Sequence, residues 1–216
     1  MKQRQVYKNK AGKRVVGVTT YLNELNKPAL VKWANKLGLQ GIDSTDYVDN
    51  LADVGTLAHA MIMAYLQGKS VPKEDYTEDQ AALAANCFGS YLNWESAHKV
   101  EPILVETPLV SEEYQFGGTP DLLAYVDGVI TLLDFKTGKA IYPEYFIQVA
   151  AYWVLLMERG YVIDKVMILR IGREESEGFE VKEVKALKTN WELFTHCQAI
   201  YELKKQARKE EKGNGS

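Results

Sequence analysis

Apolar residues recur every three or four positions through much of the first hundred residues, which is the period of an amphipathic helix. Residues 53–67 show this period clearly, with Leu57 and Met61 on one side. The pattern predicts helices over residues 21–25, 28–37, 53–67 and 77–98. Thr19 or Thr20 is the expected N-cap of the first helix, because a threonine side chain can accept a free N–H group of the first turn.

The middle of the chain changes to short runs of β-branched and apolar residues, which are typical of strands. They predict strands over residues 14–18, 102–110, 120–126, 129–136, 164–171 and 179–184. Residues 143–159 are apolar nearly all round and predict a buried helix, and residues 190–209 predict a closing helix. This order indicates an α/β (α+β) fold with one central sheet.

Length and composition agree with one compact domain. The chain has 216 residues, of which 46% are hydrophobic and 25% charged, so a wholly disordered chain is excluded. We expect a mostly helical lobe over residues 1–99, a core over residues 100–210 and a polar tail over residues 211–216. The longest apolar run, residues 149–157, is far shorter than the roughly 20 residues of a membrane helix.

Charge and cysteine content narrow the setting. The basic residues 1–14 are followed by no apolar segment, so we expect no secretory signal and a cytoplasmic protein without membrane contact. Cys87 and Cys197 are the two cysteines, which fits a reducing compartment and excludes sites that need four cysteines. The formal net charge of −3 argues weakly, by itself, against a nucleic-acid partner.

The segment TPDLLAYVDGVITLLDFK carries the first candidate chemistry. Asp127-Gly128 between two strand-like runs predicts a hairpin with a two-residue type I′ turn. Opposed residues of such a hairpin have a constant index sum, which places Asp121 opposite Asp134 if no bulge intervenes. The two would form a non-hydrogen-bonded pair, with Cβ atoms about 4.5–5.5 Å apart.

Two opposed carboxylates among leucines are destabilising unless a cation neutralises them. Carboxylate oxygens suit Mg²⁺ or Mn²⁺. Lys136 lies on the same face as Asp134 and could orient a water molecule or stabilise developing charge. The pattern therefore predicts a metal site, and the alternative is a solvated hairpin end in which Lys136 is a counter-ion.

These residues resemble a known superfamily. Pro120-Asp121 followed by Asp134-Phe135-Lys136 resembles the PD-(D/E)XK nuclease signature, and GGTPDLL…LLDFKTGK resembles its RecB-type branch, which includes phage exonuclease-like proteins. Further similarities are a G-x-x-x-H motif, a strand acid and a Q-x-x-x-Y motif, at Gly55 to His59, Glu106, and Gln148 to Tyr152. The opening GVTTYLNELNKPALVKWA is also similar to the start of such phage proteins.

The resemblance covers roughly residues 15–185. It implies a restriction-endonuclease-like core with a central mixed sheet flanked by helices and an N-terminal helical lobe that carries the G-x-x-x-H motif. It implies a metal-dependent deoxyribonuclease with one or two Mg²⁺ or Mn²⁺ ions, most simply an exonuclease that processes DNA ends in phage-type recombination or repair. The implied setting is a bacterial or phage-infected cytoplasm, with a single-strand annealing or binding protein as a further partner.

Three alternatives stay open: an inactive nuclease-like DNA-binding module, a structure-specific or single-strand endonuclease, and a metal hydrolase with another substrate. Some relatives carry an iron–sulfur cluster held by four cysteines, and the two cysteines of this chain separate it from them. The chain has no G-x-x-x-x-G-K-[ST] motif, so a helicase motor would be a separate protein.

The resemblance assigns a metal-binding role to Asp121, Asp134, His59 and the main-chain carbonyl of Phe135. In the same assignment Lys136 orients the attacking water or stabilises the transition state. His59 has a plain alternative, because a lone histidine on a helix is usually structural or solvated. A neutral imidazole would favour Mn²⁺ over Mg²⁺.

Four further residues have two interpretations each. Glu106 is either a ligand to a second metal or an edge-strand acid paired with a lysine. Gln148 and Tyr152 share a helix face and either contact the DNA backbone or form the margin of the core. Thr137 either binds a phosphate oxygen or caps the turn at Gly138.

The aromatic and basic residues complete the sequence predictions. Tyr114 and Phe116 lie in an expected loop and are candidates to stack on bases. Metal ions at the acidic site would mask its charge, which leaves the basic residues 1–14, Lys136 and Lys139 for phosphates. DNA binding is then expected to depend on divalent metal as well as on salt.

Overall fold

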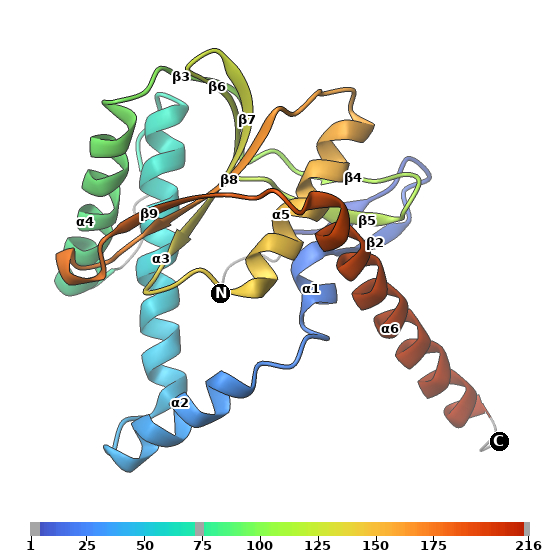
Figure 1. Cartoon of the computed structure of the whole chain (residues 1–216). Coiled ribbons are helices and arrows are strands. Elements are labelled where there is room, and N and C mark those ends of the chain that lie inside the picture. Colours follow the sequence, from blue (N-terminus) through green and yellow to red (C-terminus); the bar gives the residue numbers. More distant parts are fainter. Residues whose placement is uncertain (1–4, 72–75, 214–216) are drawn as a thin grey trace.

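A computed structural model of the chain describes residues 5–71 and 76–213. Lys2 and Arg4 of the basic N-terminal segment, and the last three residues of the polar tail, lie outside the described residues. The described part contains two mixed β-sheets and six α-helices (Figure 1). The predicted mixed α/β class with a central mixed sheet flanked by helices is confirmed.

The central sheet has five strands in the order β3-β6-β7-β8-β9. Their bounds are Val100–Val105, Leu122–Val126, Val129–Thr137, Lys165–Ile171 and Phe179–Glu183. Strands β7 and β8 run parallel because helix α5 (Pro143–Glu158) connects them, and every other pair is antiparallel. Five of the six predicted strands, those over residues 14–18, 120–126, 129–136, 164–171 and 179–184, are confirmed to within two residues at each end. The sixth, over residues 102–110, is divided into β3 and β4 (Leu109–Val110).

The two faces of this sheet are covered by different helix pairs (Figure 1). Helices α3 (Ser44–Leu66) and α4 (Glu78–Glu95) pack against one face, where Leu122 and Leu133 point. Helices α5 and α6 (Leu187–Gly213) pack against the other, where Leu123 and Leu132 point. Successive strand residues therefore alternate between two buried faces, which explains why these strands read as nearly continuous apolar runs.

The β6–β7 hairpin has the predicted register, with Val126 opposite Val129 and Leu122 opposite Leu133. Asp127 and Gly128 both have positive φ, 52° and 82°, as a type I′ turn requires. The Asp127 carboxylate also accepts hydrogen bonds from the Lys99 N–H and from His98, which ties the turn to the segment after α4.

A second, smaller sheet has the order β1-β2-β5-β4. Strands β1 (Tyr7–Lys8), β2 (Arg14–Gly17) and β5 (Phe116–Gly118) join β4, and β2 and β5 pair in parallel. The sequence predicts β2 but places residues 114–118 in a loop. Phe116 is fully buried against Trp191 and Phe194, so the expectation that it stacks on bases is wrong. Tyr114 remains partly exposed and packs edge-on against Trp191.

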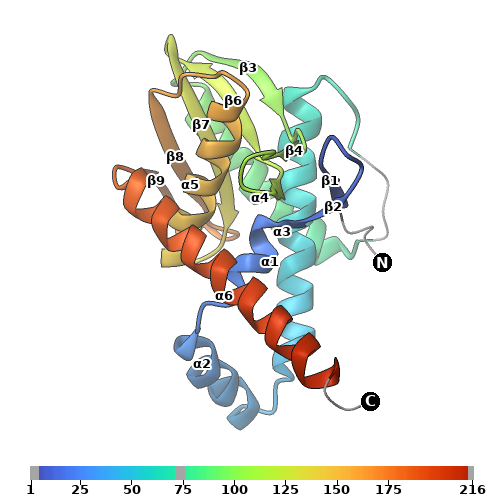
Figure 2. The same cartoon turned by 90° about the vertical axis from the view of Figure 1, so that its right-hand side faces the viewer.

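Two of the N-terminal helices begin at other residues than the sequence predicts. Helix α1 (Val18–Leu22) starts after Gly17, which makes no side-chain cap, so Thr19 and Thr20 lie inside the helix. Helix α2 (Pro28–Leu39) packs on the start of α3 and projects from the rest of the molecule (Figure 2). Helix α3 begins nine residues before its predicted start, because the Asp43 side chain accepts the N–H groups of Thr45 and Asp46.

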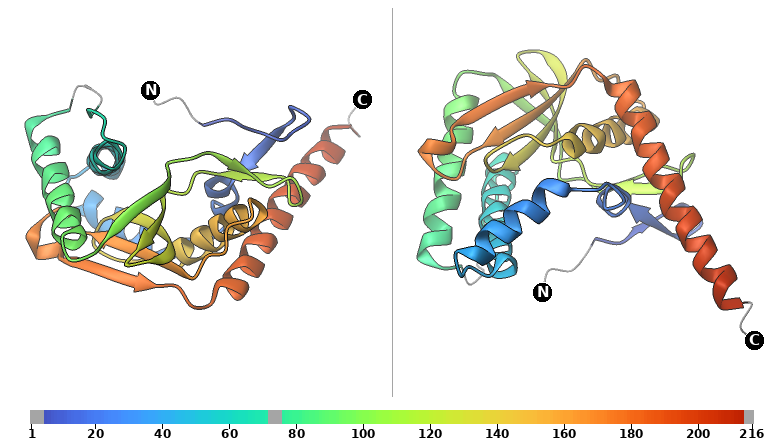
Figure 3. Two further views of the ribbon diagram at one scale, coloured as in Figure 1. Left: turned by 90° about the horizontal axis from the view of Figure 1, so that it is seen from above. Right: turned by 60° about the horizontal axis from the view of Figure 1, so that its bottom comes forward.

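Seen from above, α3 and α4 lie at one side of the molecule, and the β1–β2 hairpin and α6 lie at the other (Figure 3). Among the described residues no helix is both long and apolar enough to cross a bilayer.

The β1–β2 hairpin is attached to the core through glycine. The Tyr7 ring occupies the space that a Cβ atom at Gly117 would need, and it also lies close to Gly17, the partner of Gly117 in the β2–β5 pair. The Tyr7 hydroxyl lies 3.0 Å from Oγ1 of Thr119, within hydrogen-bonding distance.

We expect Gly117→Ala to lower the free energy of unfolding by about 1–3 kcal/mol, because the added methyl group displaces the Tyr7 ring. Gly89→Ala, on α4 with open space around it, is the matched control and should raise stability by up to about 1 kcal/mol. Urea unfolding measures both. A Gly117→Ala protein as stable as wild type would show that the hairpin is not anchored in this way.

Candidate active site

The two predicted acids lie one position beyond the last paired residues of the β6–β7 hairpin. The Asp121 carbonyl accepts the Glu106 N–H (2.8 Å), and Oδ2 of its carboxylate accepts the Phe135 N–H (2.7 Å). The side chain of Asp121 thus takes the N–H that a longer backbone ladder would have used. It is held from both neighbouring strands at once.

Asp134 lies on β7, and its side chain is 1% exposed. Its Oδ2 lies 2.6 Å from Nζ of Lys136, so the two form an ion pair. Within the described residues, neither oxygen of Asp134 has a partner that meets hydrogen-bond geometry. A buried carboxylate without such partners is costly, and this arrangement needs a further positive charge or donor to be satisfied.

Burial raises the pKa of both acids to about 6. Lys136 opposes that rise at each, and the Phe135 N–H opposes it at Asp121. The Asp121 charge raises the pKa of Asp134 further, which agrees with the predicted proximity of the two carboxylates. One lysine therefore does not fully compensate the two buried negative charges.

His59 reaches the same place from α3. Its Nδ1 lies 3.8 Å from Oδ1 of Asp121, and its ring packs edge-on against Phe135. Burial, and then the charge of Lys136, lowers the pKa of His59, so the imidazole is neutral at pH 7 and has a free lone pair. The structure thus brings His59 beside Asp121 and Phe135, as the metal-site prediction requires.

The G-x-x-x-H spacing has a steric reason in this fold. Gly55 and His59 are one turn apart on the same face of α3. A Cβ atom on Gly55 would lie only 2.7 Å from Oγ1 of Thr137, at the end of β7. Glycine therefore lets the helix approach the strand closely enough for His59 to reach Asp121.

Helix α5 supplies the other wall. Nε2 of Gln148 donates a hydrogen bond to the Tyr152 hydroxyl (2.8 Å), and Tyr152 is almost fully buried. Burial raises the pKa of Tyr152 well above its usual range, and the Asp134 charge adds to the effect. Tyr152 is therefore a core aromatic whose hydroxyl lies near the acids, and contact of Gln148 and Tyr152 with the DNA backbone stays a prediction.

Tyr145 is a site residue that the sequence argument missed. Nζ of Lys136 lies over its ring, 5.0 Å from the centroid, which is a cation–π distance. Tyr145 precedes Gln148 by three positions and Tyr152 by seven, so all three share one helix face. That spacing is a signal that could have identified it.

The sequence predictions also left out two arginines, Arg170 within β8 and Arg173 just after it. Arg170 lies opposite Lys136 in the β7–β8 register and donates to the carbonyls of Gly138 and Glu177, which fixes the turn after β7. Arg173 lies at the cleft and pairs with Glu177. Charged residues within an otherwise buried strand end were the available signal.

The remaining predicted residues lie around an open cleft of about 780 Å³. Residues from several elements line it, among them Gly55, His59, Glu106, Lys136, Thr137 and Arg173. Glu106 lies after the end of β3 with φ 46° and is exposed, so its expected place within a strand is wrong. The break at Glu106 ends the β3–β6 pairing and turns the chain toward β4.

The donor set fits a hard divalent cation. Two carboxylates, a neutral imidazole and the main chain of Phe135 converge, and the Asp134 oxygens lack hydrogen-bond partners in the described part of the chain. No three His, Cys, Asp or Glu side chains of the described residues already form a metal-holding group. In the structure, Oδ2 of Asp134 instead lies 2.6 Å from Nζ of Lys136.

No protein-family model matches the sequence, and no curated protein matches it. Among solved structures, a candidate exonuclease from Eubacterium rectale is similar at 12% identity, with a TM-score of 0.48 over 65% of this chain and 63% of that one. The chain thus spans less than two thirds of that neighbour. An alkaline exonuclease from Laribacter hongkongensis is similar at 16% identity and a TM-score of 0.36, over 73% of this chain and 90% of that one. A structure of that exonuclease with dAMP matches equally well. All these TM-scores are below 0.5, so the function rests on the residues of this chain.

Asp121→Asn tests the buried charge in EDTA. The folded protein holds the Asp121 proton more tightly than the unfolded chain, so ionisation removes stability as the pH rises through about 6. Asparagine is uncharged and can still accept the Phe135 N–H. We expect it to raise the free energy of unfolding by about 1–3 kcal/mol near pH 7.5, and by almost nothing near pH 4. A difference that does not change with pH in urea unfolding would contradict this, and Asp164→Asn, at an exposed aspartate, is the control.

The contact between Gly55 and Thr137 can be tested by a double-mutant cycle. Gly55→Ala should lower stability by about 1–3 kcal/mol, because the new methyl group meets Oγ1 of Thr137. Thr137→Ala removes that oxygen, so the double variant should recover at least about 1 kcal/mol relative to additivity. Gly38→Ala on α2 has open space and serves as the control. If thermal unfolding shows that the effects of Gly55→Ala and Thr137→Ala simply add, the methyl group at position 55 does not clash with Thr137.

Proposed function

We propose that this chain is a metal-dependent deoxyribonuclease that hydrolyses phosphodiester bonds. One observation carries the proposal: the buried Asp134 and the half-buried Asp121, with Lys136 and the neutral His59, meet beside an open cleft. Phosphodiester hydrolysis needs neutralisation of the phosphate charge, an activated water and a group that stabilises the transition state. These residues can provide all three.

Asp121, Asp134, His59 and the Phe135 carbonyl would hold Mg²⁺ or Mn²⁺. When bound, such an ion neutralises phosphate charge and lowers the pKa of a coordinated water. Without the ion, Lys136 compensates the carboxylates only in part, as their raised pKa values indicate. Ion binding is therefore coupled to relief of a repulsion that the fold itself creates.

Lys136 would orient the water or stabilise the charge that develops on the phosphate. Asp134 fixes its ammonium group from one side and the Tyr145 ring supports it from another. Burial would lower the pKa of Lys136, but the two acids outweigh burial and raise it, so the side chain stays cationic. Gln148 and Tyr152 keep the adjoining face of α5 polar next to the acids.

The finer form of the proposal is an exonuclease of the RecB-type branch that processes DNA ends. Thr137 and Arg173 line the cleft of about 780 Å³ and would be the contacts for phosphate oxygens of a strand in it. Product lengths followed in time on 5′- and 3′-labelled single and double strands separate this from an endonuclease. An exonuclease shortens the strand progressively from one end, whereas early internal fragments would identify an endonuclease.

An inactive DNA-binding module is the second candidate. The Lys136–Asp134 ion pair favours it, because an Asp134 that stays bound to lysine contributes less to a metal ion. The same labelled-strand assay separates the two functions, since a module of this kind binds DNA without cutting it.

We expect the wild-type protein to cut a labelled oligonucleotide in Mg²⁺ or Mn²⁺ and not in EDTA, and to bind DNA more weakly in EDTA. Asp134→Asn and Lys136→Ala should each reduce the cutting rate by about 100-fold or more, because each removes a charge at the reacting phosphate. Lys99→Ala is the matched control, since its side chain is 75% exposed and lies at the hairpin turn. Binding without cutting by the wild type in either metal would reject the nuclease in favour of the module.

A further inference from the structure

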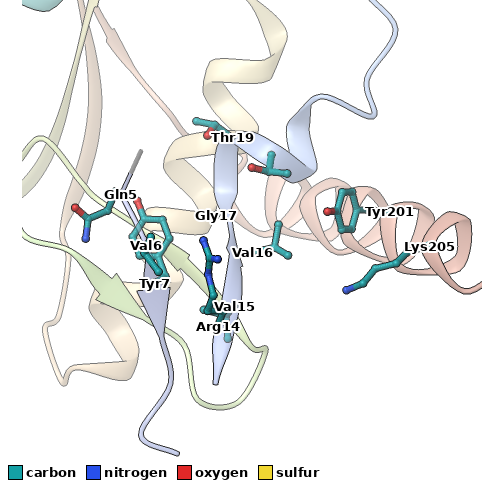
Figure 4. A pocket seen from close by; sticks show the side chains of 11 residues that line it. Gln5, Val6, Tyr7, Arg14, Val15, Val16, Gly17, Thr19, Tyr201 and Lys205 are labelled. Carbon is teal, nitrogen blue, oxygen red and sulfur yellow. The ribbon is translucent and has the colours of Figure 1, made fainter. Parts of the chain in front are cut away.

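A second hollow, of about 490 Å³, lies between the N-terminal hairpin and helix α6 (Figure 4). Its volume is within the range of sites that hold small ligands, about 300–1,000 Å³. Its walls come from β1, β2, α1 and α6, and among the described residues none lines both this hollow and the cleft. The lining includes Tyr7, Arg14, Val16, Thr19, Tyr201 and Lys205.

The hollow is positively charged in a protein whose net charge is −3. Arg14 and Lys205 line it from two different elements, and no acidic residue is found among its described lining residues. Arg14 forms no ion pair with any described residue, and its side chain extends along β2 beside Tyr7 (Figure 4). Lys205 pairs with Glu202 of its own helix (3.2 Å), outside the lining, so Arg14 is the less compensated cation.

Aromatic and hydroxyl groups adjoin these cations. Tyr201 lies one turn before Lys205 on α6, half-buried, with its ring held edge-on by Tyr21 (ring centroids 5.1 Å apart). Thr19 presents a hydroxyl-bearing side chain at the α1 end of the hollow. Cations for phosphates beside an aromatic ring for a sugar or base are the pattern by which proteins hold single strands.

The hollow is connected to the candidate active site through Tyr7. This residue lines the hollow, and its hydroxyl lies 3.0 Å from Oγ1 of Thr119, two residues before Asp121. Gly17, also in the lining, pairs with Gly117, and the four residue-to-residue steps from Gly117 to Asp121 span at most about 14 Å. A strand seated here is therefore a short distance from the acids.

We propose that this hollow binds the sugar–phosphate backbone of a single nucleic-acid strand, next to the part of the strand that enters the cleft. The proposal rests on the proposed nuclease function for its role, but the binding itself needs no cleavage. Arg14 and Lys205 contact phosphates, and Tyr201 packs against a sugar or base. The small volume suits one strand and not a duplex.

Fluorescence anisotropy with a labelled single strand of about 20 nucleotides, in EDTA, tests the proposal without cleavage. We expect Arg14→Ala/Lys205→Ala to weaken binding about tenfold or more, and to reduce the slope of log affinity against log salt by about 1.4, at about 0.7 per lost phosphate contact. For a dinucleotide the same double substitution should weaken binding much less, because a dinucleotide is too short to occupy the hollow and the cleft at the same time. Lys182→Ala/Lys188→Ala removes the same charge from exposed positions of β9 and α6 and should leave binding unchanged.

Equal losses in the two double variants would show a general charge effect and overturn the proposal. An unchanged slope of log affinity against log salt in Arg14→Ala/Lys205→Ala would also overturn it. So would a loss of affinity for blunt duplex without any loss of affinity for the single strand. Thermal unfolding of each variant shows whether it is folded, and Tyr201→Ala, expected to weaken single-strand binding without changing the salt slope, supplies a second route. If the wild type binds strands through the hollow but cuts nothing in Mg²⁺ or Mn²⁺, the proposed nuclease function fails and this inference stands.

Discussion

The main constraint on the candidate active site is the proximity of two carboxylates, Asp121 and Asp134, which the register of the β6–β7 hairpin places side by side. Asp121 and Asp134 have no freedom to separate, because Phe135 and Glu106 hold Asp121 through the backbone and Asp134 is buried on β7. Burial raises the pKa values of both acids, and a nearby negative charge adds to each rise, Glu106 at Asp121 and Asp121 at Asp134. The single ammonium group of Lys136 offsets only part of this cost. The proposed divalent cation would neutralise this pair.

Much of the surrounding architecture brings polar side chains to that pair at close range. Glycine allows α3 to pass against the end of β7, and a second glycine, Gly118, leaves room for the Tyr152 ring on α5. Arg170 fixes the turn that follows Lys136. These close approaches bring α3 and α5 against the strands that carry the two acids.

Charge is distributed differently at the candidate active site and at the hollow beside α6. The candidate active site holds Asp121 and Asp134, whereas the hollow beside α6 carries positive charge from Arg14, which forms no ion pair with a described residue. A net charge of −3 therefore says little about nucleic-acid binding, because a strand would meet local charge within a Debye length and not the sum over the chain. Tyr7 joins the two regions through one side chain, which makes the N-terminal hairpin part of the site's support.

The sequence by itself determined the elements whose signals are local. The Asp127-Gly128 turn predicts the hairpin register, and the constant index sum of that register puts Asp121 next to Asp134. Alternation put Lys136 on the face of Asp134, and the i, i+4 spacing aligned Gln148 with Tyr152. The periodicity of hydrophobic residues predicts the mixed α/β class and the first and last residues of most strands.

Only the tertiary structure decided how distant segments meet. The pairing of β2 with β5, the burial of Phe116, the break at Glu106, the place of Tyr145 under Lys136 and the basic hollow all join residues far apart in the chain or depend on a neighbour's position. Short strands such as β1 and β5 carry too few residues for a periodic signal, and they form because a partner strand supplies their hydrogen bonds. Periodicity reports which face of an element is buried, but it does not report against what.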